Sequence, residues 1–266
     1  IMSSIIKLRG KGVSRIINSK VMLSPLAGVT DKIFRKLVRK WAPESLLFTE
    51  MINATSLKHG YGTQKIKQLE LEKGPIGVQI FDNRPFAVSE AAKLAEDSGA
   101  FLIDINMGCP VKKISRKGGG SALINDRVLA VELVKRVSNA VKVPVTVKTR
   151  LGWDNKEENI EGFLLSLQEA GAEMITLHGR TRKEGFSGIA DWEMIGKIKE
   201  ILEIPVIANG DIKNPKDAFN CFKKTNADGL MIGRGILGSP WKIGEIDYAV
   251  KEIKGFKEPN IEEKLL

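Results

Sequence analysis

Eight short apolar segments recur along the chain, and each is followed by a loop and then by a stretch with a helical pattern. The segments are rich in Val, Ile, Leu and Phe and alternate little between apolar and polar positions, which is typical of parallel strands buried on both faces. We therefore expect strands at residues 21–25, 46–50, 76–81, 101–106, 145–150, 174–179, 206–211 and 229–234.

Helix signals lie between these strands. "DKIFRKLVRKW" follows the first strand, "PFAVSEAAKLAEDSG" ends at a glycine, and "NPKDAFNCFKKTN" opens on Asn214 and Pro215. Eight strand–helix units in succession predict an α/β fold, a (β/α)8 TIM barrel, and 266 residues fit one barrel of roughly 250 residues. A doubly wound open sheet is the alternative, but the count of eight favours closure.

The pattern changes after Trp241, where the sequence predicts one helix, a break containing Gly and Pro, and the start of another helix. We expect a barrel domain at residues 1–245 and, at residues 246–266, the truncated beginning of a C-terminal helical element. No apolar run reaches the roughly 18 residues that span a bilayer, so no membrane partner is expected.

Nearly every expected strand ends on a polar residue. Because the carboxyl ends of the strands converge at one mouth of a barrel, where active sites are built, we interpret this row as one site. The row consists of Ser24, Glu50, Gln79, Asn106, Lys148, Arg150, His178, Asn209, Asp211 and Arg234.

Glycines flank Arg234 in "GRG", and "NGD" ends the preceding strand. Loops after the seventh and eighth strands form the usual phosphate site of such barrels, so we favour a phosphate-bearing ligand over a turn that merely needs glycine. Neither a G-x-G-x-x-G motif after an N-terminal strand nor a G-x-x-x-x-G-K-[ST] motif is present. We expect Gly118, Gly119 and Gly120 to form a mobile loop over the mouth.

Lys148 and His178 each allow several roles at the mouth. Lys148 could form a Schiff base, hold a carboxylate, place a positive charge against an electron-accepting ring, or lie at the rim. His178 could be a general base, a ligand contact or a structural residue. With two histidines and no clustered Cys/His spacing, we expect no metal site.

Cys109 is one of two cysteines, and it follows the expected fourth strand. It could be an inert buried residue, a nucleophile, or a general acid that needs only a protonated thiol near a reacting carbon. We expect the cations that follow it, Lys112, Lys113, Arg116 and Lys117, to lower its pKa. Spacing alone does not choose among the three roles.

The formal net charge of +10 favours a polyanionic partner, although a lysine-rich solvated surface would give the same excess. Two cysteines are too few for a disulfide framework, so we expect a reducing, cytoplasmic setting.

The chain resembles the tRNA-dihydrouridine synthases, flavin enzymes that reduce a uridine of tRNA. The motifs that carry the resemblance lie in family order over about residues 20–245 and include "LSPLAGVTD", "DINMGCPVKKISRKGGGSALI", "VKTRLGW", "LHGRTRKEGFSGIADW" and "DGLMIGRGILGSPW". The resemblance implies an FMN-binding barrel followed by a small helical domain that helps to hold tRNA. It also implies that NADPH reduces the flavin again after each turnover.

The same resemblance implies roles for individual residues. Cys109 would give a proton to the target uracil, which Asn106 would contact. The residues expected to bind FMN are Pro25, Leu26, Ala27, Gln79, Lys148, His178, Asn209, Gly210, Asp211, Gly233 and Arg234. Further substrate contacts are expected from Arg150 and from basic residues around the opening that would bind tRNA phosphates, namely Arg116, Lys117, Arg180 and Arg182.

The leading hypothesis is therefore FMN-dependent reduction of a specific tRNA uridine to 5,6-dihydrouridine, with NADPH as reductant. One alternative is a flavin barrel that acts on a free pyrimidine, as dihydroorotate dehydrogenases do. Others are an RNA-binding barrel without redox activity and a phosphate-binding isomerase barrel, for which paired acid and base carboxylates are not evident.

Overall fold

The computed structural model describes residues 5–67, 69–154 and 159–265. The strands are β1 (Ile6–Leu8), β2 (Arg15–Ile17), β3 (Val21–Leu23), β4 (Leu47–Phe48), β5 (Ile52–Asn53), β6 (Ile76–Phe81), β7 (Leu102–Asn106), β8 (Val145–Arg150), β9 (Ile175–His178), β10 (Val206–Asn209) and β11 (Gly229–Ile232). The α-helices are α1 (Lys32–Arg39), α2 (Ala54–Lys58), α3 (Pro85–Asp97), α4 (Lys112–Ser115), α5 (Arg127–Ala140), α6 (Ile160–Glu169), α7 (Trp192–Ile201), α8 (Pro215–Thr225), α9 (Lys242–Val250) and α10 (Ile261–Leu265). The 3₁₀-helices are η1 (Thr63–Lys65), η2 (Leu69–Leu71), η3 (Gly120–Ile124) and η4 (Arg234–Ile236).

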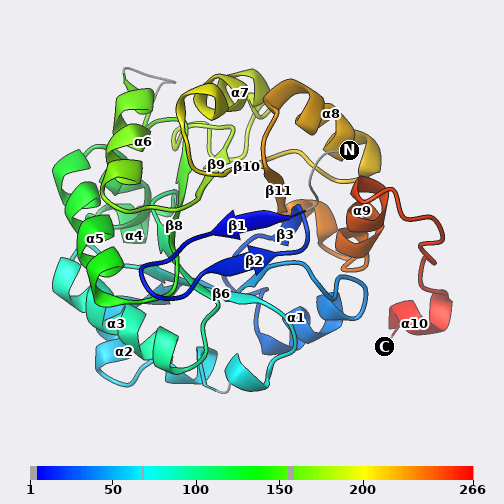
Figure 1. The fold of residues 1–266 in the computed structure, drawn as a ribbon, viewed down its shortest axis with the longest axis horizontal. Coiled ribbons are helices and arrows are strands. Elements are labelled where there is room, and N and C mark those ends of the chain that lie inside the picture. The colour runs from blue at the N-terminus through cyan, green and yellow to red at the C-terminus, as the bar shows by residue number, and fades with distance from the viewer. Residues whose placement is uncertain (1–4, 68, 155–158, 266) are drawn as a thin grey trace.

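The parallel strands close into a barrel surrounded by helices, as Figure 1 shows. β3 pairs with β11 on one side and with β4 on the other, and β4 also pairs with β6, which completes the circle. All eight strands expected from the sequence are present in this barrel, so the predicted (β/α)8 fold is confirmed. Polar side chains cap several of the surrounding helices, among them Asp31 before α1 and Asn214 before α8.

The hairpin of β1 and β2 was not expected from the sequence, and it lies across one end of the barrel (Figure 1). Ile6, Leu8 and Ile17 of this hairpin are buried against Met22, Leu102 and other residues at the strand starts. The hairpin therefore closes the amino-terminal end of the barrel and leaves the opposite end for a site.

The barrel interior changes from apolar to polar along β7. Leu102, Asp104 and Asn106 alternate with Ile103 and Ile105, so the first three face one side of the strand and the isoleucines face the other. Leu102 belongs to the apolar cluster beneath the hairpin, whereas Ile103 and Ile105 belong to the cluster that packs against the helices. The interior thus becomes polar toward the carboxyl ends of the strands.

Helix α9 packs against the barrel and spans residue 245, where the sequence analysis placed a domain boundary. Its Gly244 lies so close to Trp41 that an added Cβ would meet the Trp41 carbonyl oxygen at 2.4 Å, and its Asp247 accepts a hydrogen bond from Ser19.

No helix in the described part of the chain is long and apolar enough to cross a membrane.

Replacing Ile17 by Ala should destabilise the barrel because the Ile17 side chain is fully buried beneath it. We expect the free energy of unfolding to fall by about 2–5 kcal/mol, measured by urea denaturation. Ile16→Ala is the matched control on the same strand, since Ile16 is 53% exposed, and its effect should stay within about 0.5 kcal/mol. Equal losses in the two variants would contradict the closing role of the hairpin.

Candidate active site

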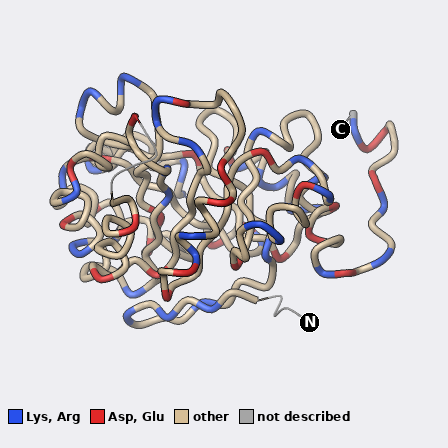
Figure 2. The backbone as a smooth tube through the Cα atoms, turned by 90° about the horizontal axis from the view of Figure 1, so that it is seen from above, with Lys and Arg blue, Asp and Glu red and all other residues tan. Residues whose placement is uncertain are grey.

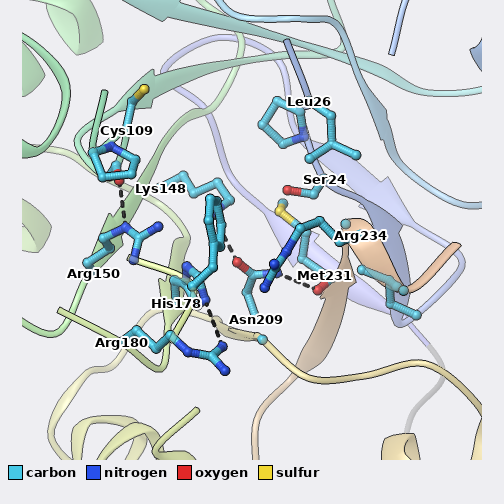
Figure 3. Close-up of a pocket in the computed structure, with 18 of the residues that line it drawn as sticks. Ser24, Leu26, Cys109, Lys148, Arg150, His178, Arg180, Asn209, Met231 and Arg234 are labelled. Atoms are coloured by element: carbon cyan, nitrogen blue, oxygen red, sulfur yellow. Dashed lines mark hydrogen bonds between the residues drawn. The ribbon is translucent and has the colours of Figure 1, made fainter. Parts of the chain in front are cut away.

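A cavity of about 550 Å³ opens at the carboxyl ends of the strands, a size within the roughly 300–1,000 Å³ typical of small-molecule sites. Figure 3 shows side chains from several strands converging on it. Every residue that the resemblance assigned to FMN lines this cavity, and so do Cys109, Asn106, Arg150 and Arg180. The structure thus brings the expected residues together.

One wall of the cavity is apolar. Pro25, Leu26 and Ala27 follow β3, and Met231 lies on the neighbouring β11. Thr30 fixes this turn, because its hydroxyl accepts a hydrogen bond from the Leu26 amide at 3.0 Å and donates one to the Leu26 carbonyl at 3.2 Å. A flat apolar ring could lie along such a wall.

Lys148 carries a positive charge into the cavity and forms no ion pair with a carboxylate among the described residues. Its Nζ donates a hydrogen bond to Asn209 Oδ1 at 3.0 Å, and Asn209 Nδ2 donates to the Met231 carbonyl at 2.8 Å (Figure 3). Burial, followed by repulsion from Arg150, lowers the pKa of Lys148 to about 8. The group is therefore charged at neutral pH, and an electron-rich or anionic ligand would stabilise this charge.

His178 is a neutral imidazole. Burial and the nearby charges of Lys148, Arg150, Arg180 and Arg234 lower its pKa strongly. Arg180 Nη1 lies 3.4 Å from His178 Nε2, and because arginine only donates, Nε2 accepts and the ring proton belongs on Nδ1. Such a ring is a poor proton acceptor, which favours ligand contact over general-base catalysis.

The loops after β10 and β11 form the expected glycine-rich end of the cavity. Gly210 has φ +118, and an added Cβ would meet the Ala190 Cβ at 2.8 Å. An added Cβ on Gly235 would lie 2.3 Å from the Ile212 carbonyl oxygen, so both loops need glycine for their close approach. Arg234 lies between Gly233 and Gly235, is exposed, and has its guanidinium carbon 4.0 Å from the Phe186 ring centroid.

Arg180 does not lie on an exposed rim as the phosphate-binding expectation required. It is buried and forms an ion pair with Asp211, whose carboxylate oxygens lie 2.8 and 2.9 Å from Arg180 Nη2. It also donates to the Ser187 and Gly188 carbonyls. The pairing of Arg180 with Asp211 therefore holds two loops together. It also means that the charge of Arg180 is already neutralised and is less available to a ligand phosphate.

Arg150 is also buried and braces the loop that carries Cys109. It donates to the Gly108 carbonyl at 2.7 Å and to the Thr181 and Gly185 carbonyls at 3.0 and 2.8 Å (Figure 3 labels Arg150). Arg150 consequently links the loop after β7 to the loop after β9, while one face of it still lines the cavity.

Cys109 is half-buried and held through its backbone. Its amide donates to Asn106 Oδ1 at 3.0 Å, and its carbonyl accepts from the Ser121 amide at 3.1 Å. Burial raises the pKa of the Cys109 thiol, and this effect outweighs the opposing influence of a Val111 backbone hydrogen bond, Arg150 and Lys148. The expectation of a lowered pKa was therefore wrong, and the thiol is protonated at neutral pH.

The glycine run after Cys109 packs against the barrel instead of standing free over the mouth. Gly119 and Gly120 are buried, and an added Cβ on Gly120 (φ +58) would meet the Cys109 carbonyl oxygen at 3.0 Å. Gly118 (φ +81) approaches the Asn83 side chain in the same way. The glycines thus allow the chain to pass close beneath Cys109.

Three expected RNA contacts lie outside the cavity. Arg116 and Lys117 are exposed on the segment that follows α4, and Lys117 borders a second hollow beside it. Arg182 stacks on Trp153, with its guanidinium carbon 4.4 Å from the ring centroid. In Figure 2 basic residues lie on the loops of the upper edge, opposite the hairpin, although the hairpin itself also carries some.

Sequence reasoning missed Met51 and Phe186, which also line the cavity. Phe186 is 54% exposed yet lies between Arg150 and Arg234, with their guanidinium carbons 5.5 and 4.0 Å from its ring centroid. An aromatic residue between Gly185 and Gly188 was the signal that could have identified it. Among the described residues, no group of three or more His, Cys, Asp or Glu is placed to hold a metal ion.

Comparisons with known proteins identify relatives of this chain. A family model described as dihydrouridine synthase (Dus) matches residues 22–265. The chain is 50% identical over 252 residues to a probable tRNA-dihydrouridine synthase 1 of Synechocystis sp., covering 95% of this chain and 71% of that protein. It is 42% identical over 232 residues to tRNA-dihydrouridine synthase B of Xanthomonas axonopodis pv. citri, covering 86% and 69%.

Two solved structures share the fold at low identity. Histamine dehydrogenase from Rhizobium sp. 4-9 matches with a TM-score of 0.68 and 14% identity, over 95% of this chain and 48% of that chain. Morphinone reductase in complex with tetrahydroNAD matches with a TM-score of 0.62 and 11% identity, over 98% and 93%. The family match and the two relatives together show that the chain belongs to the dihydrouridine synthase family.

Proposed function

We propose that this protein reduces a specific uridine of tRNA to 5,6-dihydrouridine, with FMN as cofactor and NADPH as reductant. The observation that carries the proposal is the placement of a protonated thiol, Cys109, in the same cavity as the half-buried cation Lys148. The names of its relatives, which are tRNA-dihydrouridine synthases, support tRNA as the substrate.

The residues that line the cavity support a phosphate-bearing flavin as the cofactor. The apolar wall of Pro25, Leu26, Ala27 and Met231 suits a flat ring system, and Lys148 suits an electron-rich edge of that ring. At the far end the exposed Arg234 suits a phosphate, because the buried Arg180 is already paired with Asp211. Bound FMN in its reduced form would supply a hydride to one carbon of the uracil 5,6 double bond, and NADPH would reduce the flavin again.

The chain itself would supply the proton. Reduction of the double bond leaves one carbon that must gain a proton, and a thiol that is protonated at neutral pH can donate it. Burial keeps Cys109 in this form, while Lys148 and Arg150 stabilise the thiolate that remains. Asn106 lines the cavity at the end of β7 and offers an amide to the base.

The target base must leave the stacked tRNA to enter this cavity. Arg116 and Lys117 lie exposed on the segment after Cys109 and form no ion pair within the described residues. They would bind phosphates of the tRNA beside the flipped uridine. A free pyrimidine has no backbone phosphates for Arg116 and Lys117 to bind. These two exposed cations therefore favour tRNA over a dihydroorotate-like substrate.

Arg234→Ala should weaken FMN binding without weakening riboflavin binding, because only FMN carries the phosphate. Losing a hydrogen bond to a charged group should cost roughly 10–100-fold in affinity for FMN. Titrating both flavins into apoprotein by fluorescence quenching measures this difference. Arg136→Ala is the matched control, since Arg136 lies on α5 with Glu132 as its partner. An equal loss for riboflavin would place the phosphate elsewhere.

Cys109→Ala should retain the flavin but reduce uridine roughly 10²–10⁴-fold more slowly, the usual contribution of a general acid. Quantifying dihydrouridine in tRNA by mass spectrometry under single-turnover conditions measures the rate. Cys221→Ala serves as the control, because Cys221 is buried in α8 and does not line the cavity. Wild-type turnover by Cys109→Ala would make Cys109 an inert residue.

A further inference from the structure

A continuous chain of hydrogen bonds runs inside the barrel from Asp104 to Cys109. Asp104 Oδ2 accepts from Gln79 Nε2 at 2.7 Å, and Gln79 Oε1 accepts from Asn106 Nδ2 at 2.8 Å. Asn106 Oδ1 then accepts from the amides of Gly108 and Cys109 at 3.2 and 3.0 Å. The strand register builds the first step, because Gln79 on β6 lies directly opposite Asp104 on β7.

The direction of this chain is fixed at both ends. An ionised carboxylate only accepts hydrogen bonds and a backbone amide only donates them, whereas a Gln or Asn side chain can turn either way. With Asp104 at one end, Gln79 must present its NH₂ to Asp104 and its oxygen to Asn106. Asn106 must in turn present its NH₂ to Gln79 and its oxygen to the Cys109 amide.

Besides this chain, Asp104 contributes a negative charge that partly offsets the lowering of the Lys148 pKa. It is fully buried, does not line the cavity, and its other oxygen accepts from Thr146 at 2.6 Å. Burial raises the pKa of Asp104 to about 6, although hydrogen bonds from Gln79 and Thr146 and the charge of Lys148 oppose the rise. The carboxylate is thus ionised at neutral pH, and an apolar residue of similar size would fill the space without the cost of burying a charge.

We propose that Asp104 is a positioning residue that fixes the orientation of the Gln79 and Asn106 amides and, through them, the backbone that carries Cys109. This inference rests on the proposed function for its catalytic meaning, since Gln79, Asn106 and Cys109 all line the cavity. Without a hydrogen-bond acceptor at position 104, either amide can turn over, and the oxygen that holds the Cys109 amide is then replaced by an NH₂ group.

The reactivity of the Cys109 thiol tests this role independently of tRNA. Iodoacetamide alkylation, followed by mass spectrometry of the Cys109 peptide, measures the reaction rate of this thiol. The rate is low while the loop keeps the thiol buried and its pKa raised. Asp104→Leu should accelerate alkylation roughly tenfold, because a thiol freed from its buried position ionises more readily and is more accessible. Asp104→Asn keeps an acceptor for Gln79 and should stay within about twofold of wild type.

A reversed chain gives the sharpest comparison. Asn106→Asp alone places carboxylates on both sides of Gln79, so one of its contacts becomes oxygen against oxygen and alkylation should accelerate as in Asp104→Leu. When Asp104→Asn is combined with Asn106→Asp, the introduced asparagine donates to Gln79, and Gln79 donates to the introduced aspartate. That aspartate still accepts from the Cys109 amide. The double variant should therefore alkylate more slowly than the Asn106→Asp single variant, a non-additive rescue.

Cys221 is an internal control for folding, because it is fully buried in α8 and becomes reactive only if the barrel opens. The comparison uses only variants whose Cys221 stays unreactive. In these, the proposal would be overturned if Asp104→Leu left the rate of Cys109 alkylation unchanged. It would also be overturned if the double variant showed no rescue. Equal acceleration in Asp104→Asn and Asp104→Leu would also overturn it, since charge rather than orientation would then matter.

Turnover separates this proposal from the proposed function. Asp104→Leu should lower kcat for uridine reduction by about 10²-fold, the cost of misplacing a reacting group, with a much smaller change in the KM for tRNA. A wild-type protein that reduces no uridine would refute the proposed function, yet the alkylation series would still decide the role of Asp104. A raised KM with an unchanged kcat would contradict positioning of the proton donor.

Discussion

The closure of parallel strands into a barrel is the constraint on which the rest of this structure depends. Closure turns every second side chain of a strand inward, so the interior is filled in layers from one end to the other. Strand β7 contributes Leu102, Asp104 and Asn106 to successive layers, and the hairpin of β1 and β2 closes the apolar end. Chemistry is therefore possible only at the opposite end, where the interior is polar.

The charges at that end are arranged asymmetrically. Lys148, Arg150, Arg180 and Arg234 surround His178, and within the described residues Asp211 is the carboxylate paired with one of them. Burial and the excess of positive charge together keep the imidazole neutral, the positive charge also stabilises a negative ligand, and burial keeps Cys109 protonated. One electrostatic setting thus suits both an anionic cofactor and a neutral proton donor.

The sequence predicted the strands well because each apolar segment is short and ends on a polar residue. It also predicted which residues share the cavity, since strand ends such as Lys148, His178 and Asn209 must converge in a closed barrel. The hairpin was missed because its three-residue strands carry too little apolar pattern to stand out from a loop.

Other errors came from interactions that depend on distance. Arg180 was expected at an exposed rim, but its pairing with Asp211 becomes apparent only when the two loops are placed side by side. The pKa of Cys109 was misjudged because the cations that follow it in the sequence are exposed to solvent, whereas burial acts on the thiol directly. Asp104 escaped notice because "FLIDIN" looks like a uniform buried strand, although its polar residues occupy alternate inward positions.

Mass mapping of an unmodified tRNA transcript, incubated with the purified protein, FMN and NADPH, tests the central claim most directly. We expect one uridine to gain two hydrogen atoms, and we expect free uridine given in its place to remain unreduced. A transcript of unchanged mass, from protein that binds FMN and oxidises NADPH, would contradict the claim that this cavity reduces tRNA uridine.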